Sequence, residues 1–186
     1  MDIQTEDRIQ GLAKRYQSMK IISPDLTEEL DALKGEISDE MRSMTADEQN
    51  RFTHKMRERS IAVNGQEPAT HTGYGVIRDV FCDILVERLS DTAQIRYGLI
   101  QQGMGSSQNA QDITTSITDA MLSLPNDQFE VFTNALNTYS MPTKRNGIQL
   151  NQSAINRMSF GIDEIRRIRD SVERQRIQRE SGDREL

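Results

Sequence analysis

The chain has 186 residues, of which 35% are hydrophobic and 5% aromatic, and its formal net charge is -6. This acidity excludes a general attraction of the whole protein to nucleic acid or to an anionic membrane, so binding of either kind would need a local basic patch. The single cysteine, Cys82, excludes an intramolecular disulfide and a zinc site built from several thiolates.

No stretch of the sequence approaches the roughly 18 consecutive apolar residues of a membrane-spanning helix, so we expect no membrane insertion. The first residues, MDIQTEDRIQ, lack the apolar centre of a secretory signal peptide. Together with the single cysteine, this favours a cytoplasmic protein. Export without a cleaved signal peptide stays open.

The first part of the chain reads as three amphipathic helices. Residues 2–19 place apolar side chains on one face at helical spacing. Ser-Pro at 23–24 predicts the start of a second helix, since serine is a frequent N-cap and proline is favoured at the first helical position. Thr45 followed by Glu48 is the pattern of a capping box, which predicts a third helix through about Val63.

The middle of the chain begins with a loop and continues as helices. The segment NGQEPATHTGYG, residues 64–75, has the glycine, proline and threonine content of a loop. A strongly apolar helix is predicted over 76–89. Ser90 and Asp91 then predict the start of another helix, which ends near the glycine pair at 103–107.

The last third of the chain predicts three more helices. One is capped by Ser107 or Asn109 and reaches Leu124, and the next follows directly. The segment MPTKRNG, residues 141–147, interrupts the helical period. A long last helix with a charged end is predicted over 150–186.

These elements predict an all-α fold, a multi-helix bundle of about seven or eight helices. We expect an N-terminal helical half over 1–102, a second-half helix pair over 103–149, and a long C-terminal amphipathic helix with a charged tail over 150–186. The three parts are expected to form one compact domain.

Two stretches of the chain share one skeleton. MRSMTADEQNRFTHKMRERS at 41–60 aligns without gaps on MLSLPNDQFEVFTNALNTYS at 121–140. Any capped amphipathic helix has similar spacing, but the match extends into the preceding helix, which favours a duplicated helix pair. Identical residues at this offset of 80 include Ile37 and Ile117, Met41 and Met121, Ser43 and Ser123, and Phe52 and Phe132.

A basic row and an acidic row repeat every four residues on neighbouring predicted helices. Like charges at this spacing disfavour a helix by about 0.2 to 0.5 kcal/mol per pair, so we expect compensation. A divalent metal on the acidic row is the weaker alternative, because carboxylates on successive turns lie too far apart to reach one ion. The pairs expected in this structural charge zipper are Arg59 with Asp79, Lys55 with Asp83, and Arg51 with Glu87.

Two regions predict a surface for a partner. The second-half helix is apolar over a wide arc, which indicates either a central position or contact with a partner. The last helix has apolar residues at alternating spacings of three and four, typical of a helix that docks on a bundle or forms a coiled coil. The candidate partner-binding residues are Phe129, Val131, Tyr139, Ile162, Ile165, Arg166 and Arg169.

For function, the sequence favours a non-catalytic protein–protein interaction module, such as an adaptor, regulator or effector-type protein. Its partner would be another protein or a second copy of the chain, bound through the C-terminal helix. We expect no enzymatic activity, cofactor or metal, because two histidines and one cysteine offer few catalytic groups. The alternatives are nucleic-acid binding by the arginine-rich last helix, and a helical enzyme using the acidic row.

Overall fold

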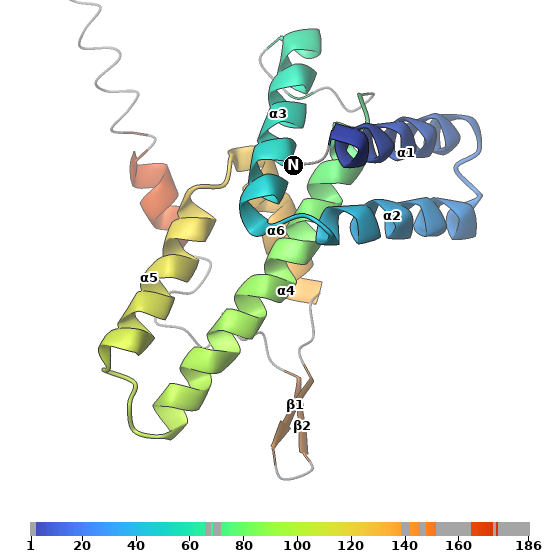
Figure 1. Ribbon diagram of the computed structural model, residues 1–186. Helices are drawn as coiled ribbons and strands as arrows, with labels where there is room; N and C mark the ends of the chain where they lie inside the picture. Colours follow the sequence, from blue (N-terminus) through green and yellow to red (C-terminus); the bar gives the residue numbers. More distant parts are fainter. Residues whose placement is uncertain are drawn as a thin grey trace, which may run out of the picture. The chain divides into compact units, whose positions relative to one another are not determined.

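The computed structural model describes residues 3–65, 68, 72–138, 142–145, 148–151, 165–172 and 174. As predicted, the fold is all-α, a multi-helix bundle (Figure 1). It also contains one short hairpin, which the sequence did not predict. Residues 165–172 are also helical and are named here the C-terminal helix. The elements are α1 (Ile3–Ile22), α2 (Thr27–Arg42), α3 (Ala46–Asn64), α4 (Tyr74–Gln101), α5 (Gln108–Leu122), α6 (Asn126–Thr138), β1 (Pro142–Arg145) and β2 (Ile148–Asn151).

The chain divides into two compact units. The first is Met1–Leu85 and the second is Val86–Leu186, so the division falls within α4. The predicted boundary near residues 103–107 lies inside the second unit, in the turn between α4 and α5.

In the first unit, α1 and α2 run antiparallel, side by side (Figure 1). The predicted start of α2 at the Ser-Pro pair is wrong, since the helix begins at Thr27. Ser23 belongs to the end of α1, because its N–H donates to the carbonyl of Met19 at 2.8 Å. The intervening residues form a turn, in which the N–H of Leu26 donates to the carbonyl of Ser23 at 3.2 Å.

The predicted capping box at the start of α3 is confirmed. The Thr45 Oγ1 accepts from the Glu48 backbone N–H at 3.3 Å, and the Thr45 N–H donates to the Glu48 carboxylate at 2.9 Å. The pKa of Glu48 is lowered to about 2, and the hydrogen bond from the Thr45 backbone is the largest of the contributions. This local cap explains why residue 45 marks the helix start so clearly in the sequence.

The two helices predicted on either side of Ser90 form one helix, α4, so the predicted break there is wrong. Buried Val86, Leu89 and Ala93 carry the apolar face of the helix through this point at spacings of three and four. Ser90 itself is completely buried and does not cap a helix end. Continuous burial therefore outweighs the local capping tendency of the Ser-Asp pair.

Each unit has its own apolar core. The residues of the first unit with 0 or 1% exposure include Ile9, Ala13, Ile37, Met41, Phe52, Tyr74, Ile77 and Val80. In the second unit they include Val86, Ala110, Ile117, Met121, Phe132, Leu136 and Ile165. Ile165 shows that the C-terminal helix contributes to the second core.

A two-stranded antiparallel hairpin follows α6. Its register pairs Thr143 with Leu150 and Lys144 with Gln149. The sequence between the strands is Asn-Gly, the dipeptide most typical of a two-residue hairpin loop. Because β2 extends to Asn151, the last helix cannot start at residue 150 as predicted.

Candidate functional site

The end of α5 leaves main-chain carbonyls without partners inside the helix, as every helix end does. The N–H of the cap residue Ser123 donates to the carbonyl of Asp119, and its hydroxyl donates to the carbonyl of Ala120, at 2.9 Å each. The carbonyls of Met121 and Leu122 instead accept hydrogen bonds from a residue far along the chain, Arg169.

Arg169, on the C-terminal helix, places its guanidinium at the junction of α5 and α6. Its Nη1 donates to the carbonyl oxygens of Met121 at 3.2 Å and Leu122 at 3.1 Å, and its Nη2 donates to the Asn126 Oδ1 at 2.7 Å. Burial lowers the pKa of the guanidinium, while the nearby carboxylates of Glu130 and Asp170 act in the opposite direction. A planar fork of donors suits several spread acceptors, which a lysine could not satisfy together.

Phe129 of α6 forms the apolar side of the same junction. Its ring is 3% exposed, and the guanidinium carbon of Arg169 lies 4.4 Å from the ring centroid. The guanidinium carbon of Arg166 lies 5.9 Å from that centroid, and its Nη2 is 3.3 Å from the Glu130 carboxylate. Both cations therefore lie within the distance of a cation–π contact.

A cavity of about 440 Å3 remains beside these contacts. We name its walls from α5 and α6, namely Leu122, Asn126, Phe129 and Glu130, the α5–α6 corner. The C-terminal helix completes the cavity. Its lining residues are Arg166, Arg169, Asp170 and Val172, and Val172 is 60% exposed. Main-chain acceptors, an aromatic face and carboxylates provide binding chemistry for a cation.

The corner brings together several of the residues predicted to bind a partner. The cavity is lined by Phe129 of α6 and by Arg166 and Arg169 of the C-terminal helix. Ile165, on the C-terminal helix, is completely buried. Val131 is half-buried on α6 and does not line the cavity. The remaining two predicted residues, Tyr139 and Ile162, lie outside the described residues.

Sequence reasoning missed Asn126 and Glu130. The two are four residues apart on α6 and therefore share one face of that helix. Their spacing was the available signal, but nothing local indicated that an arginine 43 residues after Asn126 would bind there.

The corresponding junction of α2 and α3 has its own donor. Gln49 is aligned with Phe129 at the offset of 80, and its side-chain Nε2 donates to the carbonyls of Met41 at 2.9 Å and Met44 at 3.4 Å. Met41 is in turn aligned with Met121. The carbonyls at the end of α2 therefore accept hydrogen bonds from a glutamine of the next helix, whereas those at the end of α5 accept them from an arginine far along the chain.

Two pairs of the predicted charge zipper are wrong, because α1 supplies the partners of the basic row. The ammonium of Lys55 lies 2.6 Å from the carboxylate of Glu6, and Arg59 donates to the side-chain oxygen of Gln10 at 3.1 Å. Glu6 and Gln10 are themselves four residues apart on α1, so they match the spacing of the basic row. The third pair, Arg51 with Glu87, stays a prediction.

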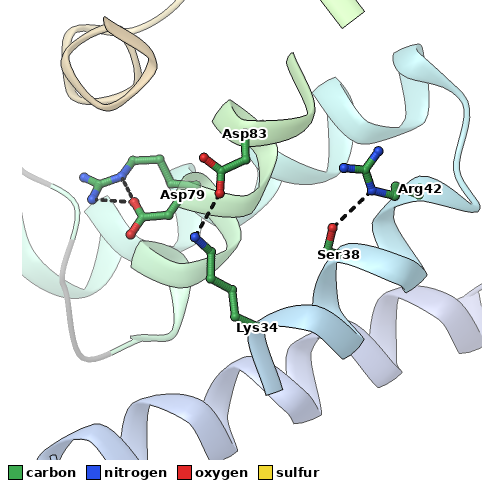
Figure 2. Close-up of polar contacts among 6 residues, drawn as sticks. Lys34, Ser38, Arg42, Asp79 and Asp83 are labelled. Carbon is green, nitrogen blue, oxygen red and sulfur yellow. Dashed lines mark hydrogen bonds and ion pairs between the residues drawn. The ribbon is translucent and has the colours of Figure 1, made fainter. Parts of the chain in front are cut away.

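The acidic row of α4 also has other partners. Asp83 accepts from the Lys34 ammonium of α2 at 2.8 Å, as Figure 2 shows, and Asp79 accepts from Arg78 at 3.0 Å. Burial acts to lower the pKa of Lys34, but the hydrogen bond and charge of Asp83 raise it overall. Within the part of the chain that the structure describes, no three His, Cys, Asp or Glu side chains are grouped to hold a metal ion.

Comparisons with known proteins identify no relative of this chain: no protein-family model, curated protein or solved structure matches it. In the described part of the chain, every helix is too short or too polar to cross a membrane.

Proposed function

We propose that this chain is a non-catalytic interaction module that binds a partner protein through a helical surface centred on the α5–α6 corner. The observation that carries the proposal is the C-terminal helix seated at this corner with Ile165 buried and Arg169 bonded to three oxygens. A groove that accepts one amphipathic helix has the chemistry to accept another.

The described arginine contacts favour a protein partner over nucleic acid. Arg169 is committed to protein oxygens, and Arg166 lies beside the Glu130 carboxylate. Phosphate binding needs basic side chains that are available to the ligand and are not neutralised nearby. We expect an adaptor, regulator or effector-type role, and the single cysteine favours a cytoplasmic location.

We also infer that the pairs α2–α3 and α5–α6 are two copies of one helix pair. Support comes from their ends, since α2 ends at Arg42 and α5 at Leu122, while α3 begins at Ala46 and α6 at Asn126. Both C-cap residues have the right-handed helical backbone conformation, with φ and ψ of -70° and -17° at Ser43 and of -75° and -14° at Ser123. The helix ends, helix starts and C-cap residues of the two pairs are thus all 80 residues apart.

Photo-crosslinking tests the proposed surface. A photoreactive amino acid replaces Val172, which is exposed beside the cavity, in the full chain. The protein is irradiated both in purified form and in an extract of its source cells, and the mass of the adduct is measured by mass spectrometry. The matched control carries the same photoreactive amino acid in place of Arg51, which is exposed on α3.

We expect a protein adduct from position 172 and none from position 51. An adduct with twice the mass of the purified chain identifies a second copy as the partner. An adduct that disappears after nuclease treatment supports the nucleic-acid alternative instead. Equal labelling from positions 172 and 51 would contradict a partner site at the corner.

A further inference from the structure

We infer that the α5–α6 corner recognises an arginine side chain presented by a helix of a partner protein, and that Arg169 fills the corner as an intramolecular ligand. The recognised segment carries an aliphatic residue four positions before the arginine, as Ile165 precedes Arg169. This inference rests on the proposed function and adds the chemistry of the partner.

The acceptors fit a guanidinium better than an ammonium. Two nitrogens of Arg169 reach three oxygens that belong to Met121, Leu122 and Asn126, at 2.7 to 3.2 Å. Two of these oxygens are carbonyls at the end of α5, where the helix dipole is negative. A lysine presents one nitrogen and cannot span the three acceptors from a single position.

Phe129 adds selectivity for a flat cation. Its ring faces the guanidinium of Arg169 at 4.4 Å, and an arginine can stack on an aromatic face while its edge still donates hydrogen bonds. A neutral side chain of equal length would lose the attraction to the ring and to the carboxylate of Glu130. The corner therefore combines a stacking face with acceptors at one edge.

The α2–α3 junction shows what the corner lacks. There, Gln49 provides the amide donor for Met41, and 80 residues later Phe129 provides none for Met121. At the second junction the described donor to the Met121 and Leu122 carbonyls is Arg169, from the C-terminal helix. The first junction therefore takes its donor from its own helix pair, whereas the second takes one from an arginine of a separate helix.

The C-terminal helix packs at the α5–α6 corner through few buried side chains. Among its eight residues, Ile165 is the one completely buried side chain, and Arg166, Arg167 and Val172 are exposed. The adjoining cavity of about 440 Å3 leaves room for larger apolar groups than this helix supplies. A partner helix with the same arginine and a longer apolar face can therefore displace it.

Fluorescence anisotropy of a labelled peptide tests this inference. The peptide has the sequence of residues 160–176, and the receptor is the full chain with Ile165→Asp and Arg169→Gln, which vacate the corner. A second receptor with Arg169→Gln alone retains the buried isoleucine, and circular dichroism verifies that each receptor is folded. We expect the peptide to bind the doubly substituted, vacated chain about ten-fold more tightly than the unaltered chain.

Peptide variants then test the preference for arginine. Arg169→Lys in the peptide should weaken binding to the vacated chain about ten-fold, because charge is kept while the fork is lost. Arg174→Lys is the matched control and should leave binding unchanged, since Arg174 is exposed. Phe129→Gln in the vacated chain should abolish binding, because its amide would cap Met121 as Gln49 caps Met41.

The outcomes separate the two proposals. Equal binding of the unaltered peptide and the Arg169→Lys peptide would overturn arginine recognition and leave the corner a general helix-binding site. Failure of every peptide to bind a folded, vacated chain would overturn the proposed function at this corner as well. Binding that survives Phe129→Gln would place the peptide elsewhere on the chain and overturn both.

Discussion

The guanidinium of Arg169 lies over the ring of Phe129, with 4.4 Å between the guanidinium carbon and the ring centroid, and it also donates hydrogen bonds to the end of α5. The two residues are 40 positions apart in the sequence. Their contact joins the C-terminal helix to α6 within the second unit.

A double-mutant cycle should measure this contact directly. Phe129→Leu and Arg169→Gln, alone and together, are expected to show a coupling free energy of about 0.5 to 2 kcal/mol in chemical denaturation, because the stacked cation is partly desolvated. The same cycle with Arg174→Gln is the control, since Arg174 is exposed. Coupling of equal size in both cycles would show that stacking on Phe129 is not its source.

Ile165→Ala should detach the C-terminal helix. The side chain is completely buried, and removal of a buried isoleucine costs about 2 to 5 kcal/mol. Hydrogen–deuterium exchange at residues 165–172 is therefore expected to become faster, while exchange in α2 and α3 stays unchanged. Val172→Ala, at an exposed position, is the control. Unchanged exchange in the Ile165 variant would show that other contacts hold the helix.

Lys55→Ala should destabilise the first unit, because the Glu6 side chain is 7% exposed and would lose its partner. Leaving a buried polar group unsatisfied costs about 1 to 3 kcal/mol and more for a charged one, a loss measurable by chemical denaturation. Adding Glu6→Leu to the same chain should recover most of the loss. Arg51→Ala, at an exposed position of the same helix, should change the unfolding free energy by less than about 0.5 kcal/mol.

The capping box predicts a specific pH dependence. The folded-state pKa of Glu48 is lowered to about 2, so the stability that its carboxylate adds is present above the unfolded pKa of about 4.3 and is lost as pH falls to 2. Thermal unfolding of the wild type and of Glu48→Gln should therefore differ most above pH 5 and converge toward pH 2. A difference that stays constant over this range would contradict the assignment.

Ser90→Ala should leave stability unchanged or raise it by up to about 1 kcal/mol. Among the described residues, the buried Ser90 hydroxyl has no hydrogen-bond partner, and alanine is the better helix former. Ser60 is equally buried but has an interaction partner, so Ser60→Ala should lower the unfolding free energy by about 0.5 to 1.5 kcal/mol. Thermal denaturation of both variants checks the contrast, and a clear loss at Ser90 would reveal a hidden partner.

Much of the candidate site was visible in the sequence as separate pieces. The apolar arc of α6 indicated Phe129, and the periodic stripe of the last segment indicated Ile165 and Arg169. What the sequence could not indicate was that these residues meet, or that Asn126 completes the set. A hydrogen bond between residues 43 positions apart depends on the path of the chain between them.

By itself, the sequence determined the all-α class, the capping box at Thr45 and most helix positions, because caps and apolar periodicity act within a few residues. Only the tertiary structure decided that α4 continues through Ser90, that Lys55 pairs with Glu6, and that Arg169 completes the end of α5. A charged side chain bonds whichever complementary group packing brings within reach, and a buried apolar face extends a helix past a local stop signal. Both effects depend on which helices become neighbours, and the packing of the apolar core within each unit decides that.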